Sequence, residues 1–312
     1  MDSAKPLTIS LNPTYLCNFR CEFCYLRPEQ LADQKKLDPS RLVAMVEEIR
    51  SHGYYIEHVD LYGGEVGLLS PTYLEKLDEI LNVYSKPSIS VITNLSKINS
   101  YFLHDYVDLS VSLDFEAREK HELVLSNMAK ISKPIAILML ASPNLLKLDI
   151  NRMIGILNTY QNVVSVEIKP YSSNQANTLP VTDKEYEEFV KQWLISPIRK
   201  NFTFINKNRI KDSLSGLYSA YSDSHVYITP NGKFGVLEFD LEQNEYFFEM
   251  DSFNEYLLWA RLEKTKVKSN PICSACPYLG RCLTEHYRDV KSIEKSCSGF
   301  RDLLDWASQS LT

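Results

Sequence analysis

The chain has 312 residues, of which 44% are hydrophobic and 24% are charged. These shares are ordinary for a globular protein and exclude fibrous and disordered classes. The net charge is −6, from 34 basic and 40 acidic residues with no basic block, so nothing in the sequence indicates a surface for a nucleic acid polymer.

Targeting segments and known nucleotide motifs are both missing from the sequence. No apolar run approaches the roughly 20 residues of a membrane span, and the start, Met-Asp-Ser-Ala-Lys-Pro, has no apolar signal core. We therefore expect a cytoplasmic protein that makes no membrane contact. The absence of glycine-rich dinucleotide and P-loop motifs removes the main support for those two classes.

The first 170 residues alternate strand-like and helix-like segments. Asp38-Pro39 and Ser70-Pro71 are typical helix starts, and Thr182-x-x-Glu185 resembles a capping box whose helix should run to about Lys200. Six runs rich in Val, Ile and Leu predict buried parallel strands: Leu7–Leu11, His58–Tyr62, Ser88–Thr93, Leu109–Leu113, Ile135–Leu140 and Val163–Ile168. This order predicts an α/β fold, a partial (β/α)6 TIM-type barrel with functional loops at the carboxyl ends of its strands.

The pattern changes near residue 201. Val226–Thr229 and Lys233–Phe239 flank Pro230-Asn231-Gly232, which predicts a β-hairpin because Asn-Gly suits a tight turn. A short helix is expected after Ser252, and Phe300–Ser308 is expected to form a closing helix. We therefore predict a barrel domain over residues 1–200 and a small α+β domain over residues 201–312.

Seven cysteines form two groups, three near the start of the chain and four near its end. An odd count in a reducing compartment argues against a disulfide framework. The first group, Cys17-x3-Cys21-x2-Cys24, lies in the loop after the first strand. Three thiolates can hold three irons of a [4Fe–4S] cluster and leave the fourth iron open to a substrate or cofactor. A zinc site with a distant fourth ligand and a set of structural thiols remain open as alternatives.

Two motifs carry a resemblance to a known family. Cys17-Asn-Phe-Arg-Cys21-Glu-Phe23-Cys24 resembles the C-x3-C-x-φ-C signature of radical S-adenosylmethionine (SAM) enzymes, with Phe23 as the aromatic residue. Gly63-Gly64-Glu65, which ends the second strand, resembles the segment that holds the methionine amine of SAM in that family. The resemblance covers about residues 7–200 and implies a SAM-binding [4Fe–4S] cluster on the three cysteines.

The resemblance also implies further contacts to SAM. Polar residues at the ends of the third and fourth strands would line its ribose and carboxylate, the end of the sixth strand would lie near its adenine, and aromatic residues of the cysteine loop would complete the site. These cofactor-binding candidates are Thr93, Asn94, Ser112, Asp114, Lys169, Phe23 and Tyr25. A polar strand end that only faces solvent is the alternative for each strand residue.

The second group, Cys273-x2-Cys276-x5-Cys282-x14-Cys297, supplies four thiolates, enough for one closed metal site. A structural zinc site is one interpretation. The region also resembles the SPASM/twitch extensions of radical SAM enzymes, which implies a second, auxiliary [4Fe–4S] cluster on these four cysteines. His286 stands where a full SPASM domain has a further cysteine, and Leu237 stands in place of another. We therefore expect two clusters in total.

The resemblance implies an oxidoreductase or maturase. Such an enzyme takes an electron from flavodoxin or ferredoxin, cleaves SAM reductively to a 5′-deoxyadenosyl radical and abstracts hydrogen from a substrate C–H bond. With all seven cysteines assigned to metal, none is left as a hydrogen donor, and the catalytic residue is unknown.

Three functions compete. The leading hypothesis is post-translational modification of a ribosomal peptide, by crosslinking or oxidation, although the early first strand predicts no N-terminal leader-peptide-binding domain. The alternative is dehydrogenation or rearrangement of a small molecule such as an amino sugar or nucleoside. A zinc-stabilised, non-catalytic binding protein is the hypothesis from a different class.

Overall fold

The computed structural model describes residues 4–171, 181–217, 224–240, 245–284, 297 and 299–311. Their strands form one sheet in the order β10-β9-β8-β1-β2-β3-β4-β5-β6-β7. The strands are β1 (Lys5–Leu11), β2 (Tyr54–Leu61), β3 (Ser88–Thr93), β4 (Val107–Ser112), β5 (Ile135–Leu140), β6 (Val163–Lys169), β7 (Thr203–Phe204), β8 (His225–Ile228), β9 (Phe234–Asp240) and β10 (Glu245–Met250). The helices are α1 (Pro28–Ala32), α2 (Pro39–Ser51), α3 (Pro71–Leu81), α4 (His121–Met128), α5 (Ile150–Asn158), α6 (Asp183–Ile195), α7 (Ile205–Ser215), α8 (Phe253–Ser269), α9 (Pro271–Ser274) and α11 (Arg301–Ser310).

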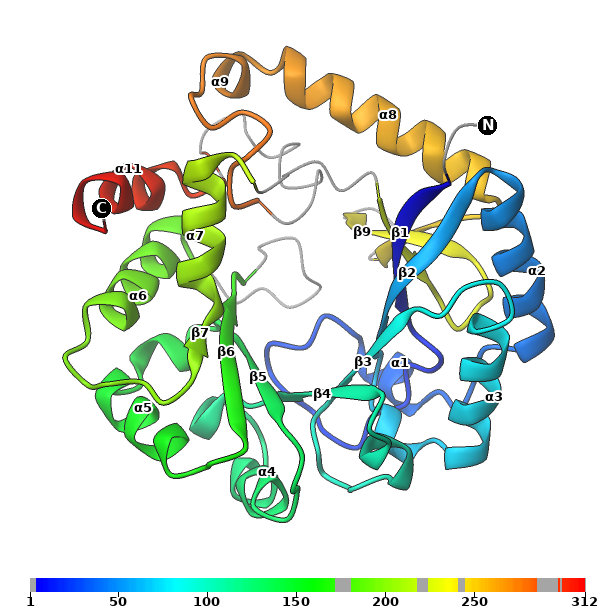
Figure 1. The fold of residues 1–312 in the computed structure, drawn as a ribbon, viewed down its shortest axis with the longest axis horizontal. Coiled ribbons are helices and arrows are strands. Elements are labelled where there is room, and N and C mark those ends of the chain that lie inside the picture. Colours follow the sequence, from blue (N-terminus) through cyan, green and yellow to red (C-terminus); the bar gives the residue numbers. More distant parts are fainter. Residues whose placement is uncertain are drawn as a thin grey trace.

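Strands β1 to β6 are parallel neighbours and curve around a common interior, with helices α2 to α6 on the outside (Figure 1). This arrangement confirms the predicted partial barrel. The outward-facing residues Leu7 and Ile9 of β1 join Leu42 and Met45 of α2 in the main hydrophobic core. Apolar side chains thus hold the helices to the sheet.

Helix starts follow the predicted capping residues. Asp38 accepts a hydrogen bond from the backbone N of Ser40 at the start of α2, and Thr182 forms the predicted capping box with Glu185 at the start of α6. Helix α6 ends at Ile195, before the expected Lys200. The difference has a local cause, because Pro197 disfavours helical backbone at the residue before it.

The C-terminal part continues the barrel sheet. Strands β8 and β9 form the predicted hairpin, with Gly232 at a φ of +71° in the turn, and β10 adds a third antiparallel strand that the sequence did not indicate. Strand β8 pairs in parallel with β1, so the hairpin extends the barrel sheet instead of forming a sheet of its own. The small C-terminal portion with antiparallel strands is confirmed.

The predicted boundary near residue 201 lies within shared structure. Strand β7 pairs with β6, and Phe204 and Ile210, on either side of the start of α7, belong to the same hydrophobic core as the barrel. The division into 1–200 and 201–312 stays a prediction. None of the helices among the described residues combines the length and apolar character needed to cross a bilayer.

Candidate active site

The loop that follows β1 (residues 12–27, here the cysteine loop) lies against the end of β2. The backbone N of Gly64 donates to the carbonyl of Thr14 at 2.9 Å, and the backbone N of Glu65 donates to the carbonyl of Leu16 at 2.8 Å. A Cβ on Gly63 would lie 2.3 Å from the carbonyl oxygen of Thr14, and one on Gly64 would lie 2.2 Å from that of Tyr15. The two glycines therefore allow strand β2 to seat the loop that carries the cysteines.

All three thiols of the cysteine loop accept hydrogen bonds from nitrogen donors. The Sγ of Cys17 accepts from the backbone N of Phe19 at 3.5 Å, and the Sγ of Cys24 accepts from the backbone N of Leu26 at 3.4 Å. Burial raises the pKa of all three thiols, that of Cys24 to about 12. The N–H donors have the opposite effect, because a hydrogen bond to sulfur favours the negatively charged thiolate. Hydrogen bonds to sulfur also tune iron–sulfur clusters, so this donor set fits one.

Two side chains also donate hydrogen bonds to these sulfurs. Asn94, after β3, donates its Nδ2 to the Sγ of Cys17 at 3.8 Å. Arg118 donates its Nη1 to the Sγ of Cys21 at 3.6 Å. Among the residues that the structure describes, no group of three His, Cys, Asp or Glu side chains surrounds one position suited to a single metal ion.

Glu65 is almost fully buried, with 1% of its surface exposed, and ties the end of β2 to the end of β3. Its Oε1 accepts from the backbone N of Gly67 and from Oγ1 of Thr93, and its Oε2 accepts from the backbone N of Asn94, each at 2.6 Å. Burial raises the pKa of Glu65, and the hydrogen bonds partly oppose this effect. The structure therefore brings the predicted residues Glu65, Thr93 and Asn94 together, while their contact with SAM stays a prediction.

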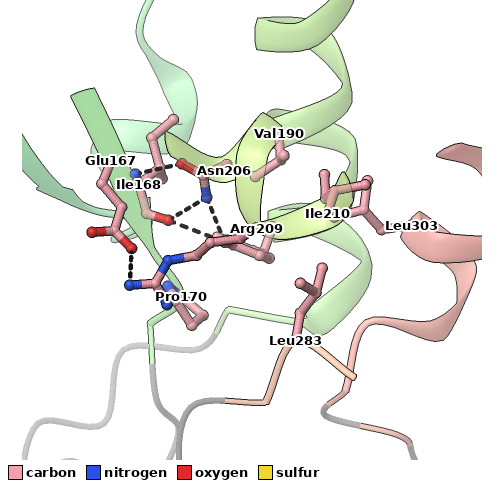
Figure 2. A pocket seen from close by; sticks show the side chains of 10 residues that line it. Glu167, Ile168, Pro170, Val190, Asn206, Arg209, Ile210, Leu283 and Leu303 are labelled. Carbon is pink, nitrogen blue, oxygen red and sulfur yellow. Dashed lines mark hydrogen bonds and ion pairs between the residues drawn. The ribbon is translucent and has the colours of Figure 1, made fainter. Parts of the chain in front are cut away.

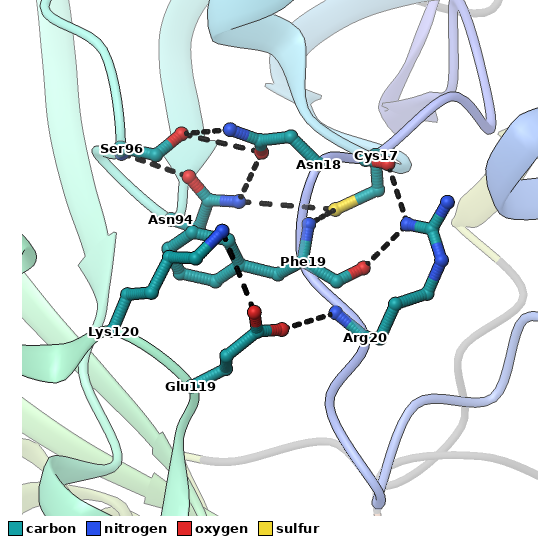
Figure 3. A network of polar contacts seen from close by, with 8 residues as sticks. All are labelled: Cys17, Asn18, Phe19, Arg20, Asn94, Ser96, Glu119 and Lys120. Atoms are coloured by element: carbon teal, nitrogen blue, oxygen red, sulfur yellow. Dashed lines mark hydrogen bonds and ion pairs between the residues drawn. The ribbon is translucent and has the colours of Figure 1, made fainter.

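A polar network fixes the outer side of the cysteine loop (Figure 3). Asn18 Nδ2 donates to Ser96 Oγ at 2.9 Å, and its Oδ1 accepts from Asn94 Nδ2 at 3.2 Å. On the other side, the backbone N of Arg20 donates to Oε2 of Glu119 at 2.8 Å. Sequence reasoning missed these braces, and the position of Asn18 beside a motif cysteine was the one signal available for them.

The predicted residue Asp114 is fully buried and already has partners. Its Oδ2 accepts from Nε of Arg118 at 2.7 Å and lies 2.6 Å from Nη2 of the same guanidinium, while its Oδ1 accepts from the backbone N of Leu140 at 2.6 Å. Burial alone would lower the pKa of Arg118, but the negative charges of Asp114 and Cys21 outweigh it and raise that pKa. Asp114 thus holds a charged arginine beside a cysteine sulfur.

Other predicted cofactor residues lie around the same edge. Phe23 packs under the Arg118 guanidinium, with 5.1 Å between Cζ and the ring centroid, and Tyr25 meets Phe247 of β10 edge-on at 6.0 Å. Ser112 ends β4 and is half-buried. Their roles toward SAM stay predictions.

Lys169 lies at the end of β6, which three strands separate from β2 in the sheet order. Its Nζ lies 3.1 Å from Oε1 of Glu167, which also accepts an ion pair from Arg209 of α7 at 2.7 Å. A pocket beside these residues lies between β6, α6, α7 and α11, where Asn206 bonds the backbone of Ile168 (Figure 2). The role predicted for Lys169 toward the adenine of SAM stays untested.

The interior of the barrel is polar along β1, β2 and β8. Nε2 of His58 lies 3.1 Å from Oδ1 of Asp60, and Ser10 Oγ lies 2.7 Å from Nε2 of His225. Burial would raise the pKa of Asp60, but the hydrogen bond from His58 and the charges of His225 and Lys169 lower it. Lys169 of β6 is therefore within electrostatic reach of Asp60 across the interior.

The four C-terminal cysteines also come together. Asn270 caps α9 by accepting from the backbone N of Cys273 at 3.2 Å, and a Cβ on Gly299 would lie 3.1 Å from the Sγ of Cys282 and 3.5 Å from that of Cys297. Burial, followed by the charges of the other cysteines, raises the pKa of Cys282 to about 11. Backbone N–H groups oppose this rise at Cys282 and Cys297, as they do at the N-terminal group. His286 lies outside the described residues.

Comparison with known sequences identifies a family for the first part of the chain. Residues 11–123 match the model of the radical SAM superfamily. An "S-adenosylmethionine-dependent nucleotide dehydratase" from Psychrobacter lutiphocae is 23% identical over 261 residues, which cover 74% of this chain and 82% of that protein.

Solved structures share this fold. The structure titled "Native anSMEcpe with bound AdoMet" has a TM-score of 0.70 and 15% identity, and the match covers 98% of both chains. SuiB from Streptococcus suis, solved with its precursor peptide SuiA, has a TM-score of 0.64 and 16% identity, covering 96% of this chain and 76% of SuiB. At these identities the likeness establishes the fold, and it extends over the C-terminal part as well as the barrel.

Proposed function

We propose that this chain is a radical SAM enzyme that modifies a peptide, and that its Cys17, Cys21 and Cys24 hold a [4Fe–4S] cluster that binds SAM. When bound, the cluster and SAM supply a 5′-deoxyadenosyl radical that abstracts hydrogen from a C–H bond. The chain itself contributes the seat for the loop, the charge around the sulfurs and the polar strand ends that surround the cofactor.

One observation carries the proposal. Each of the three sulfurs accepts an N–H donor, and these donors come from the loop itself and from residues after β3 and β4. Three separate strands therefore contribute to one sulfur environment at the carboxyl edge of the sheet, where barrel enzymes place their chemistry. Structural thiols without a metal would remain neutral at these raised pKa values and would have no need of four N–H donors.

We further propose an auxiliary [4Fe–4S] cluster on Cys273, Cys276, Cys282 and Cys297. The mutual electrostatic effects among these thiols and the backbone donors to Cys282 and Cys297 support a shared site. Four thiolates close the site, so electron transfer or structural support suits this cluster better than substrate binding.

The test of the cofactors is a metal and sulfide analysis of anaerobically purified protein before and after cluster reconstitution. We expect roughly eight irons and eight sulfides per chain, and formation of 5′-deoxyadenosine when SAM and dithionite are added. Replacing Cys17, Cys21 and Cys24 together by alanine should leave roughly four irons and abolish 5′-deoxyadenosine. About four irons with one zinc in the wild type would assign the C-terminal cysteines to zinc. Little iron in both preparations would refute the proposal.

Two structural relatives support a peptide substrate, because the titles of the SuiB structure and of an anSMEcpe structure name bound peptides. The similarity to each covers at least 96% of this chain, including the region of the C-terminal cysteines. An auxiliary cluster would accept one electron from the peptide radical that hydrogen abstraction leaves, which is consistent with crosslinking or oxidation of a side chain.

A polar small molecule, such as a nucleotide or amino sugar, is the second candidate. The barrel interior offers two hydrogen-bonded pairs, His58 with Asp60 and Ser10 with His225, and the match to the nucleotide dehydratase relative extends over most of the chain. His58, Asp60 and His225 are partly exposed, and side chains of this kind suit the hydroxyl groups of such a molecule.

One assay separates the two substrate classes. Wild-type protein with SAM and dithionite is supplied either with peptides encoded by short reading frames beside its gene or with a panel of nucleotides and amino sugars. The readout is 5′-deoxyadenosine above the level formed without substrate. We expect stimulation by a peptide. Stimulation by a small molecule and by none of the peptides would overturn the peptide proposal in favour of the second candidate.

A further inference from the structure

Arg118 is a cationic side chain that donates a hydrogen bond to a cysteine sulfur. Its Nη1 donates to the Sγ of Cys21 at 3.6 Å, and only 12% of its side chain is exposed. A buried cation interacts with a nearby negative charge more strongly than an exposed one, because less water screens it. Arg118 therefore acts on the charge of this one sulfur more than a surface arginine could.

The guanidinium is held from two further sides. Asp114 engages Nε and Nη2, the edge away from Nη1, at 2.7 and 2.6 Å, and the Phe23 ring packs 5.1 Å from Cζ. Asp114 is itself fixed by the backbone N of Leu140 at 2.6 Å. With both neighbours buried, the arginine has little freedom to turn away from the sulfur.

The carboxylate of Asp114 does not cancel the effect of the arginine on Cys21. Nη1 contacts the sulfur directly, whereas the Asp114 oxygens lie behind the guanidinium. The guanidinium is therefore the charged group in direct contact with the sulfur, and the Asp114 carboxylate contacts the opposite edge of the guanidinium.

We propose that Arg118 is a positioning residue that raises the reduction potential of the cluster bound by the cysteine loop. This inference rests on the proposed function, because it requires a [4Fe–4S] cluster on Cys17, Cys21 and Cys24. Reduction adds one electron, so the reduced cluster is the more negative form, and a fixed cation at a ligand sulfur stabilises it over the oxidised form. The electron comes from a low-potential donor such as flavodoxin, ferredoxin or dithionite.

The test compares Arg118→Gln with wild type by a redox titration followed by electron paramagnetic resonance, on reconstituted protein without SAM. The signal of the N-terminal cluster is identified by its change when SAM is added afterwards. At a fixed poise we expect at least a tenfold lower ratio of reduced to oxidised cluster, which equals 59 mV for a one-electron couple. Iron and sulfide per chain are measured on the same samples.

Arg20→Gln is the matched control. Arg20 lies in the same loop, and its Nη1 donates to the carbonyl oxygens of Cys17 and Phe19, which are backbone atoms and not sulfurs. Its loss should leave the ratio within about threefold of wild type, a span that corresponds to less than half of the tenfold shift of 59 mV. A tenfold shift in this control would contradict the specific role of Arg118.

Arg118→Lys keeps the charge and decides the case if Arg118→Gln does not retain its irons. A ratio within about threefold of wild type supports the role of the charge, and a tenfold shift overturns it. The proposal is also overturned if Arg118→Gln keeps its iron and sulfide and shows an unchanged reduction potential. This holds even if the variant binds SAM more weakly than wild type. Wild-type protein that takes up no iron would instead refute the proposed function itself.

Discussion

Gly64 shows how a single missing methyl group determines whether the cysteine loop can reach its seat. The position that a Cβ would take lies 2.2 Å from the carbonyl oxygen of Tyr15 and 2.3 Å from that of Leu16. Both atoms are backbone, so they cannot rotate away as a flexible side chain would. The second strand and the loop can adapt to a side chain here only by separating.

We therefore predict that Gly64→Ala lowers iron at the N-terminal site while leaving the C-terminal cysteines loaded, giving roughly four irons per chain after reconstitution instead of roughly eight. Gly155→Ala in α5 is the control, because its Cβ would meet nothing within 4 Å. That change should keep full iron content and stabilise the fold by up to about 1 kcal/mol. Full iron loading of Gly64→Ala would contradict the role of Gly64 in the contact between the end of β2 and the cysteine loop.

Glu65 acts on the protein itself through three short hydrogen bonds at 2.6 Å. In Glu65→Gln, an amide NH2 would face at least one donor that now meets an oxygen. We predict a loss of about 1–3 kcal/mol in the free energy of unfolding, measured by urea denaturation without cofactors.

Thr93→Val removes one of the three donors to Glu65 and keeps the shape, so it should cost less than Glu65→Gln. A wild-type urea midpoint for Glu65→Gln together with lost SAM binding would instead assign Glu65 to the cofactor alone. The comparison therefore distinguishes a structural role of Glu65 between β2 and β3 from a role in binding SAM.

At the scale of elements, helices α6 and α11 meet through a buried carboxyl group. Glu187 of α6 is 5% exposed and accepts a hydrogen bond from the backbone N of Leu303 in the first turn of α11. Helix α11 has no side-chain cap of its own, so Glu187 serves this end from a neighbouring helix. Burial raises the pKa of Glu187 to about 7, and the charge of Asp302 adds to the rise.

The raised pKa predicts a stability that falls with pH. The stabilisation from the bound proton is complete below the unfolded pKa of 4.5 and is lost as the pH rises through about 7. The loss amounts to about 3 kcal/mol at most, at about 1.4 kcal/mol per pKa unit. Urea denaturation at pH 5 and pH 8 should show a smaller decline for Glu187→Gln than for wild type. Equal declines in the two proteins would contradict the buried, protonated state.

Local sequence patterns predicted the bounds of helices and strands more accurately than the contacts between residues far apart in the chain. Strands β3 and β5 have the predicted bounds, and the caps of α2, α3 and α6 lie at the predicted residues, because apolar periodicity and capping depend on neighbours in sequence. Arg118 was missed because its sulfur partner is 97 positions away. Strand β7 was also missed, since two residues give no periodicity to detect.

At the scale of the whole molecule, the C-terminal hairpin forms one wall of the barrel sheet. Strand β8 lies between β9 and β1, and Val226 and Ile228 are fully buried in the common core. Removal of the C-terminal part would leave β1 with an open edge and apolar residues of the barrel exposed. An open edge of this kind invites aggregation.

We predict that a fragment of residues 1–200 does not fold independently and aggregates, whereas the full chain remains monodisperse in size-exclusion chromatography. Co-expression of residues 201–312 with the fragment is the control, because it supplies the missing wall and should recover soluble complex. A monomeric fragment with a cooperative thermal transition would instead establish the predicted boundary near 201 as a true domain limit.

The pairing of β1 with β8 also determines when, during synthesis, the barrel sheet can be completed. Ser10 and His225 hydrogen-bond across 215 positions of the chain. A ribosome adding about 5–20 residues per second needs roughly 10–40 s between those two residues. During that interval the first three cysteines have left the ribosome while the strand that leads to them lacks its final neighbour. Assembly of the proposed cluster in the completed site is therefore a late event in biogenesis, which follows the synthesis of β8.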